Sequence, residues 1–163
     1  MTNLSFRQAK PSDLDRCYQI ETTAYAGDEA ATKEKILKRI EMYPEGFLIL
    51  ENDKEIIGFV NCGAADKVEL SDESFKELVG HHSDGKNIVI MSVVTHPGYQ
   101  RQGMATRLMK RFIEQMREAG KHKMLLICQT ELIPLYASFG FVDLGPSESN
   151  HGGLQWHEME MVL

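Results

Sequence analysis

The residues of this chain whose types and spacing could do chemistry lie between an apolar segment and a helix-forming one. Residues 87–95 are rich in β-branched side chains and free of charge, as in a buried strand. Pro97 and Gly98 end that strand, and residues 100–106 lead into a segment whose apolar residues recur at spacings of three and four. The start of a helix presents unpaired N–H groups and the positive end of the helix dipole. Such a loop can bind an anionic group, for example a pyrophosphate.

Two small residues and two arginines suit this loop to a phosphate. Gly103 removes a side chain where a phosphate would approach, and Ala105 does nearly the same. Arg101 and Arg107 add positive charge nearby. On spacing alone, an ordinary turn between a strand and a helix explains Gly103 equally well. The pattern by itself leaves both interpretations open.

The order of residues around the loop resembles a known cofactor-binding segment. Val93-Val94-Thr95-His96-Pro97, followed by Gln100-x-x-Gly103-x-Ala105, is similar to the acetyl-CoA-binding segment of the GNAT superfamily of N-acetyltransferases. The resemblance implies that acetyl-CoA is the cofactor and that CoA is a product. It assigns to cofactor binding the residues Val93, Val94, Thr95, Gln100, Arg101, Gln102, Gly103, Met104, Ala105 and Thr106.

Motifs elsewhere resemble one branch of that superfamily, the arylalkylamine (serotonin-type) N-acetyltransferases. The similarity covers residues 128–141, then Gly145-Pro146 and Glu158-Met159, and it extends back to Phe6-Arg7 and Ile20-Glu21. It therefore spans nearly all 163 residues. The resemblance implies an enzyme that moves an acetyl group to a primary amine of a small molecule, with arylalkylamines as one class. We expect direct attack in a ternary complex.

The elements that must position these residues predict one α/β domain over residues 1–163. Their order is strand, two helices, two strands, a polar helical insertion at residues 69–79, then strand, helix, strand, helix and two strands. The superfamily's sheet has about seven strands, is mixed but mostly antiparallel, and is flanked by helices. The resemblance makes the strands ending at Thr95 and Cys128 a parallel pair that splays apart at the cofactor site.

Local signals predict where several elements begin and end. Ser12 and Thr32 are expected to cap the first two helices, with Asp15 completing a capping box after Ser12. Asn52-Asp53 is expected to turn a hairpin, and Gly120 to end the long helix.

Tyr136 is the residue that we expect to act as general acid. The resemblance places it at the position of the family's tyrosine. A thiolate leaving group is basic enough to take a proton from a phenol, whose reference pKa is about 10. Composition alone favours an alternative, in which Tyr136 is an amphipathic-helix residue with its hydroxyl at the surface.

The general base has no residue assigned to it. The arylalkylamine enzymes carry two histidines on the central strand, and the matching positions here are Val89 and Met91, which cannot accept a proton. Other members use a carboxylate on that strand, and residues 88–95 contain none. The base is therefore a water held by backbone carbonyls, or a carboxylate from another element such as Glu21. The lack of the two strand histidines weakens the prediction of a serotonin-type substrate more than the prediction of acetyl transfer.

Aromatic residues are expected to hold the amine. The resemblance carries over Tyr25 and Trp156 as residues lining the amine pocket, and Ile127 is assigned to the substrate with them. The alternative for Trp156 is an ordinary core position. Two further functions stay open: acetylation of a protein N-terminus or lysine, and a CoA-binding module without catalysis.

Composition and charge exclude other classes of protein. A formal net charge of −6 argues against nucleic acid or an anionic membrane as partner, and no apolar run is long enough to span a bilayer. The first ten residues lack the apolar core of a signal peptide, and three separated cysteines suggest a reducing compartment, so we expect a cytoplasmic location. For the assembly state we expect a monomer or a homodimer. Cys128 is expected to be a buried filler, and no metal site is expected. Of the six histidines, His96 is expected to be structural, and His122, His151 and His157 to lie at the surface.

Overall fold

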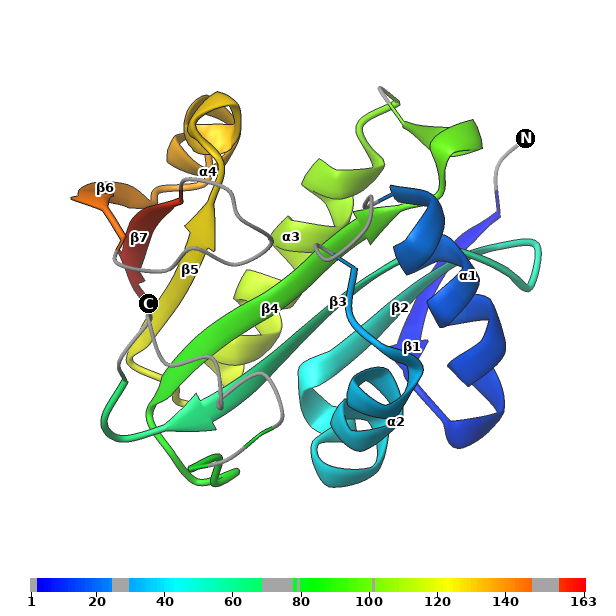
Figure 1. Ribbon diagram of the computed structural model, residues 1–163, viewed down its shortest axis with the longest axis horizontal. Helices are drawn as coiled ribbons and strands as arrows, with labels where there is room; N and C mark the ends of the chain where they lie inside the picture. The colour runs from blue at the N-terminus through cyan, green and yellow to red at the C-terminus, as the bar shows by residue number, and fades with distance from the viewer. Residues whose placement is uncertain (1–2, 25–29, 69–77, 79, 101, 148–155) are drawn as a thin grey trace. The chain divides into compact units, whose positions relative to one another are not determined.

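Seven strands form one mixed sheet in the order β1-β2-β3-β4-β5-β7-β6 (Figure 1). The structure is a computed structural model, which describes residues 3–24, 30–68, 78, 80–100, 102–147 and 156–163. Except for Leu78, the predicted insertion at residues 69–79 lies outside the described residues. The elements are β1 (Leu4–Gln8), α1 (Leu14–Ala24), α2 (Lys33–Met42), β2 (Phe47–Asn52), β3 (Glu55–Ala65), β4 (Asn87–Thr95), α3 (Met104–Glu118), β5 (Lys123–Cys128), α4 (Ile133–Ala137), β6 (Val142–Pro146) and β7 (His157–Val162).

The pairing of the strands confirms the predicted fold class. The antiparallel pairs are β1 with β2, β2 with β3, β5 with β7, and β6 with β7. The parallel pair joins β4 to β5, with Asn87–Val89 opposite Lys123–Leu125. The two strands that end at Thr95 and Cys128 are therefore the parallel pair, as expected.

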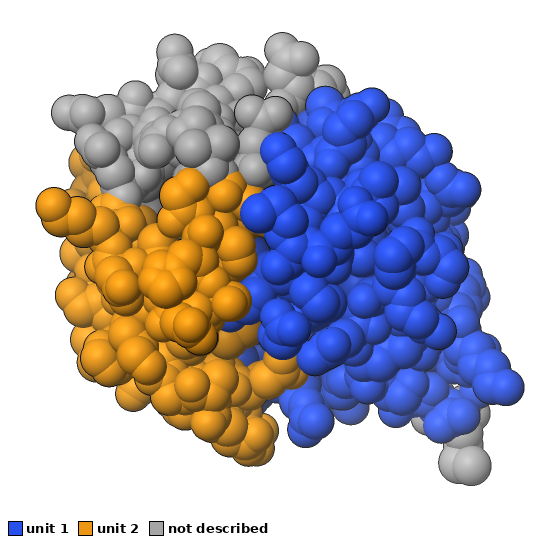
Figure 2. Space-filling view, turned by 90° about the horizontal axis from the view of Figure 1, so that it is seen from below, with its two compact units in different colours: residues 1–62, 92–112 blue, residues 63–91, 113–163 orange. Residues whose placement is uncertain are grey.

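The chain forms two compact units (Figure 2). Unit 1 consists of residues 1–62 and 92–112, and unit 2 of residues 63–91 and 113–163. The strands β3 and β4 and the helix α3 each have residues in both units. The single domain over residues 1–163 stays a prediction.

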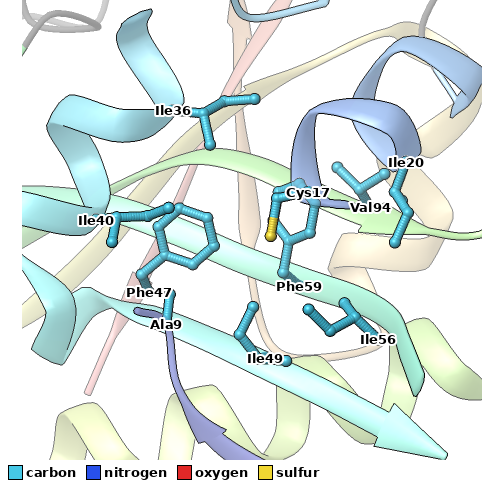
Figure 3. Close-up of a cluster of buried hydrophobic side chains, with 10 residues drawn as sticks. All are labelled: Ala9, Cys17, Ile20, Ile36, Ile40, Phe47, Ile49, Ile56, Phe59 and Val94. Atoms are coloured by element: carbon cyan, nitrogen blue, oxygen red, sulfur yellow. The ribbon is translucent and has the colours of Figure 1, made fainter. Parts of the chain in front are cut away.

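Unit 1 is held together by an apolar cluster between its first two helices and its strands (Figure 3). The helical rows of α1 and α2 supply Cys17, Ile20, Ile36 and Ile40, which follow the spacing of three and four expected for an amphipathic helix. Burial of this apolar surface is the main force that fixes the two helices on the strands. The strand residues of the cluster include Phe47, Ile49, Ile56, Phe59 and Val94.

The predicted cap of α2 is confirmed, but the cap of the first helix is wrong. The hydroxyl of Thr32 accepts the Lys35 N–H at 3.3 Å. In place of a cap at Ser12, a 3₁₀ turn at Pro11–Asp13 precedes α1, and the Asp13 carboxylate accepts the Lys10 N–H at 2.8 Å. A carboxylate accepts N–H groups more strongly than a hydroxyl does, and Arg7 also holds Asp13 through two bonds of 2.8 and 2.9 Å.

The hairpin turn lies one residue later than predicted. Asp53 and Lys54 have φ values of +50° and +71°, so they are its two central residues. Asn52 is the last residue of β2, and its side chain accepts the Asn3 N–H at 3.1 Å.

In unit 2, the end of the α4 segment packs on β7. A Cβ atom at Gly140 would lie 3.3 Å from the Met161 sulfur, so the loop after α4 approaches the strand closely. Within the described residues, no helix combines the length and the apolar character needed to cross a bilayer.

Candidate active site

The loop predicted to bind a phosphate lies in unit 1, at the start of α3. β4 ends at Thr95, a 3₁₀ turn follows at Pro97–Tyr99, and α3 begins at Met104. Gly103 immediately precedes the helix with a φ of +78°, a conformation that glycine adopts without strain. Among the described residues, a Cβ atom there would have no neighbour within 4 Å, so none of them blocks the approach to this position.

Side chains hold this loop from within. The Gln100 side-chain amide donates to the Thr95 carbonyl oxygen at 3.2 Å, and that of Gln102 donates to the Gly98 carbonyl at 3.2 Å. His96 Nδ1 accepts the Gly98 N–H at 3.0 Å, which agrees with the structural role expected for this histidine. These bonds fix the path of the backbone between the strand and the helix. Arg101 lies outside the described residues.

The start of α3 offers N–H groups to an anion. The Arg107 N–H donates to the Gly103 carbonyl at 3.1 Å, so the N–H groups of residues 104–106 precede the helical ladder and have no acceptor within it. They add to the positive end of the helix dipole. An anionic pyrophosphate fits this arrangement, because it needs donors and an approach free of side chains.

Tyr136 lies in α4, within unit 2. Its ring packs edge-on against Phe139 and Phe141, with centroids 6.4 and 5.9 Å away. The residue is 8% exposed, so the alternative of a surface tyrosine is wrong. Burial, followed by the nearby Cys128, raises the pKa of the phenol above its ordinary range. The hydroxyl therefore keeps its proton at neutral pH and is a hydrogen-bond donor.

Cys128 behaves as the expected filler at the end of β5. It is 2% exposed, and its thiol lies 3.6 Å from the Met159 sulfur. Burial, followed by the charges of Asp143 and Glu131, raises the pKa of the thiol to about 11. A thiol of this kind carries little thiolate at neutral pH and is a poor nucleophile.

The residues predicted for the amine have different surroundings. Ile127 is half-buried and lies opposite Glu158 in the pairing of β5 with β7. Trp156 is 9% exposed, and its carbonyl oxygen accepts the Ser147 N–H at 2.7 Å. Tyr25 lies outside the described residues.

Unit 1 contains a buried polar cluster that the sequence did not lead us to expect. Arg39 of α2 is 2% exposed and points its Nη1 at Asn61 Oδ1 of β3 and Ser92 Oγ of β4, at 3.4 Å each. Glu21 of α1 is 1% exposed and accepts the Ala31 N–H at 2.9 Å. Burial lowers the pKa of Arg39 to about 10, while the Glu21 charge opposes that shift. The guanidinium therefore stays charged at neutral pH.

Helical spacing contained a signal for Arg39. It lies three residues after Ile36 and four before Tyr43, on the buried row of α2. An arginine on such a row is ordinarily placed at the surface, because burying its charge requires a partner on another element. The partners come from positions 21, 61 and 92, which are far apart in the sequence.

His157, expected at the surface, is half-buried: its side chain is 18% exposed, and Nδ1 lies 3.2 Å from Asp143 Oδ1. His157 begins β7 and pairs with Cys128, the last residue of β5. The contact with Asp143 could not be predicted from the sequence, because the two residues are 14 positions apart and no motif links them.

Comparison with known proteins identifies the family. The model of the acetyltransferase (GNAT) family matches residues 14–141, more than three quarters of the chain. The chain belongs to the GNAT family. A curated relative, the serotonin N-acetyltransferase of Mesocricetus auratus, is 25% identical over 162 residues, which cover 97% of this chain and 77% of that protein.

Solved structures share the GNAT fold. The loading GNATL domain of CurA from Lyngbya majuscula superposes with a TM-score of 0.87 at 17% identity, covering 98% of both chains. The yncA protein of Salmonella typhimurium, solved with its cofactor acetyl-CoA, has a TM-score of 0.71 at 24% identity and covers 99% of this chain and 94% of its own. These findings confirm the predicted N-acetyltransferase with acetyl-CoA as its cofactor.

Proposed function

We propose that this GNAT enzyme moves the acetyl group of acetyl-CoA to a primary amine of a small molecule. The observation that carries the proposal is Gly103, an open left-handed residue directly before α3. Its position, the donors of residues 104–106 and the bonds that brace the loop together suit the pyrophosphate of CoA. When bound, acetyl-CoA supplies a thioester whose carbonyl carbon is open to attack by an amine.

The backbone of residues 93–95 and the loop of residues 100–106 are the proposed cofactor-binding segment. The side chain of Val94 is buried in the apolar cluster of unit 1, so its backbone is the part that would meet a ligand. Met104 is also buried and anchors the first turn of α3. Ala105 and Thr106 are half-buried and add their N–H groups.

Tyr136 is the proposed donor to the leaving thiolate. Its raised pKa keeps the hydroxyl protonated, which favours donation of a hydrogen bond. The same shift makes complete transfer of the proton less favourable than it is for an ordinary phenol. We therefore give Tyr136 the task of stabilising the developing thiolate.

Direct attack by the amine is favoured over a covalent enzyme intermediate. Cys128 interacts electrostatically with Tyr136, and the shift of its pKa to about 11 leaves it mostly protonated at neutral pH. A protonated, buried thiol cannot compete with an amine for the thioester.

A small amine is favoured as acceptor by the serotonin N-acetyltransferase relatives and by the aromatic residue Trp156. With Ile127 and Tyr25, Trp156 is proposed to hold the apolar part of the amine.

The three cysteines are free and buried, which supports our inference of a cytoplasmic location.

The test is release of CoA, measured with a thiol reagent, from acetyl-CoA and each member of an amine panel. The panel contains tryptamine, 2-phenylethylamine, butylamine and a peptide with a free N-terminus and a lysine. The proposal predicts release above the rate without amine, and faster release with a small amine than with the peptide. A preference for the peptide would transfer the function to protein acetylation, and no amine-dependent release would overturn the proposal.

A further inference from the structure

Asp143 and His157 form a carboxylate–imidazole pair on two adjacent strands of unit 2. Asp143 Oδ1 lies 3.2 Å from His157 Nδ1 and also accepts the Gly145 N–H at 2.8 Å. The bond from Gly145, followed by the bond to His157, lowers the pKa of Asp143. Asp143 is therefore a carboxylate that can only accept, so the proton between the two residues belongs to Nδ1 of the imidazole. In the neutral ring, Nε2 is then left with its lone pair.

The register of the strands places His157 beside Cys128, which interacts electrostatically with Tyr136. His157 lies directly opposite Cys128, and such partners in a sheet point their side chains to the same face, with Cβ atoms about 4.5–5.5 Å apart. Met159 belongs to that face as well, because its sulfur meets the Cys128 thiol. Cys128 in turn acts electrostatically on Tyr136. Gly140, three residues after the end of α4, closely approaches Met161, which shares this face of β7, so the segment that carries Tyr136 packs on the face of His157.

His157 has the properties that a proton-transferring residue needs. Its side chain is 18% exposed, so it is neither sealed in the core nor freely mobile in solvent. An imidazole ring can take a proton on a free nitrogen and later return it, as a general base and acid must. A base whose second nitrogen is held by a carboxylate is the arrangement that fixes tautomer and orientation in hydrolytic triads. Tyr136 cannot fill this role, because its pKa is raised.

We propose that His157 is the general base and acid of acetyl transfer and that Asp143 positions it. This inference rests on the proposed function. The amine, neutral after losing its first proton to solvent, attacks the thioester carbon through its nitrogen lone pair, and a C–N bond forms. His157 Nε2 takes the proton that the nitrogen sheds. The C–S bond then breaks, and the imidazolium returns that proton to the thiolate, which leaves as CoA–SH. Tyr136 donates a hydrogen bond to the same sulfur.

The titratable groups that the described residues place near His157 come from two strands. Asp143 of β6 contacts the ring, and Cys128 of β5 lies opposite His157 in the sheet. Tyr136 of α4 and Glu131 of the preceding turn each interact electrostatically with Cys128. Cys128 and Tyr136 are neutral near pH 7 because burial raises both pKa values. Among the described residues, Asp143 is the charge that contacts the ring.

The test compares His157→Gln and Asp143→Asn with a matched pair elsewhere in unit 2. His82 and Asp66 lie 3.6 Å apart with side chains 56% and 67% exposed, and His82→Gln and Asp66→Asn serve as controls. The reaction uses acetyl-CoA and 2-phenylethylamine between pH 5.5 and 9. We expect His157→Gln to lower kcat by roughly 10²–10⁴-fold and to abolish the acid limb of the rate profile, with CoA affinity unchanged. Asp143→Asn should also lower kcat, because the imidazole loses the carboxylate that holds its orientation and tautomer.

Four results decide the proposal. Full kcat and an unchanged acid limb in His157→Gln would remove the role of His157, provided that the wild-type enzyme is active. An equal loss in the His82 control would also contradict it. A wild-type enzyme unreactive with every amine would instead remove the proposed function and this role with it. Nitrogen-15 NMR of the histidine rings tests the pair without activity: we expect the neutral ring of His157 to carry its proton on Nδ1, and a proton on Nε2 would overturn the proposal.

Discussion

Gly103 and Gly120 share a φ of +78° and lie immediately before and two residues after α3. At both positions an added Cβ atom would have no neighbour within 4 Å. A side chain therefore imposes the same backbone strain at either place, about 1–2 kcal/mol for a left-handed residue. Gly103 alone lies at the proposed pyrophosphate site.

Because Gly103 and Gly120 have the same φ and the same free space, Gly120 is a matched control in a test of cofactor binding. Gly103→Glu and Gly120→Glu should lose similar amounts of stability in thermal unfolding. By calorimetry, Gly103→Glu should weaken CoA binding by tenfold or more, because a carboxylate stands against the pyrophosphate; tenfold corresponds to about 1.4 kcal/mol. Gly120→Glu should keep the wild-type Kd. Equal CoA affinity in both variants would remove the loop from the cofactor site.

The pH dependence of Tyr136 follows from the direction of its shift. Burial raises the pKa of the phenol above the ordinary value of about 10, so the protonated donor form persists as the pH rises to that value. Activity should then not fall between pH 8 and 10 through loss of this proton. Tyr136→Phe keeps the ring contacts with Phe139 and Phe141 and should lower kcat by roughly 10²-fold. A wild-type alkaline limb centred near pH 10 or below that disappears in Tyr136→Phe would show that the pKa of the phenol is not raised.

Variants of Trp156 can distinguish a role in the amine pocket from a purely structural role in the core. If its ring holds the amine, Trp156→Ala should raise the KM for tryptamine and leave the KM for butylamine and the Kd for CoA little changed. Its low exposure makes some loss of stability certain, so Trp156→Phe, which keeps an apolar ring, is the companion variant. A normal tryptamine KM in a folded Trp156→Phe enzyme, together with unfolding of Trp156→Ala, would place Trp156 in the core.

The sequence predicted the regular elements well where local periodicity decides them. The apolar run of β4 has the same bounds in the structure, and Gly120, with its positive φ, follows the end of α3. The predicted cap at Ser12 was wrong because the Asp13 carboxylate satisfies the backbone instead, and the predicted turn was one residue early because Asn52 is still part of β2.

Contacts between residues that are far apart in the sequence could not be predicted from local patterns. Arg39 is buried beside the side chains of Asn61 and Ser92 and in the field of the Glu21 charge, and Asp143 contacts His157 from the neighbouring strand. Residue type alone assigns charged and polar side chains such as these to the surface. The strand, turn and helix around residues 100–106 could be predicted because their signals are adjacent in the chain.

The pair of Arg39 and Glu21 predicts a strong coupling in stability. Arg39→Met removes a buried cation and leaves the Glu21 carboxylate without its compensating charge, which should cost about 3–5 kcal/mol in the free energy of unfolding. The double variant Glu21→Gln with Arg39→Met should be more stable than Arg39→Met alone. Urea unfolding of the wild type, both single variants and the double variant measures the coupling. Additive losses would show that the two charges do not depend on each other.

The central claim is transfer of acetyl from acetyl-CoA to the nitrogen of a small amine. Its most direct test uses acetyl-CoA labelled with deuterium in the acetyl group, tryptamine and the purified enzyme, with mass spectrometry of all products. We predict labelled N-acetyl tryptamine and free CoA in equal amounts, both rising with enzyme concentration and both suppressed in Gly103→Glu. Label found only in free acetate, or on the protein itself, would contradict the claim.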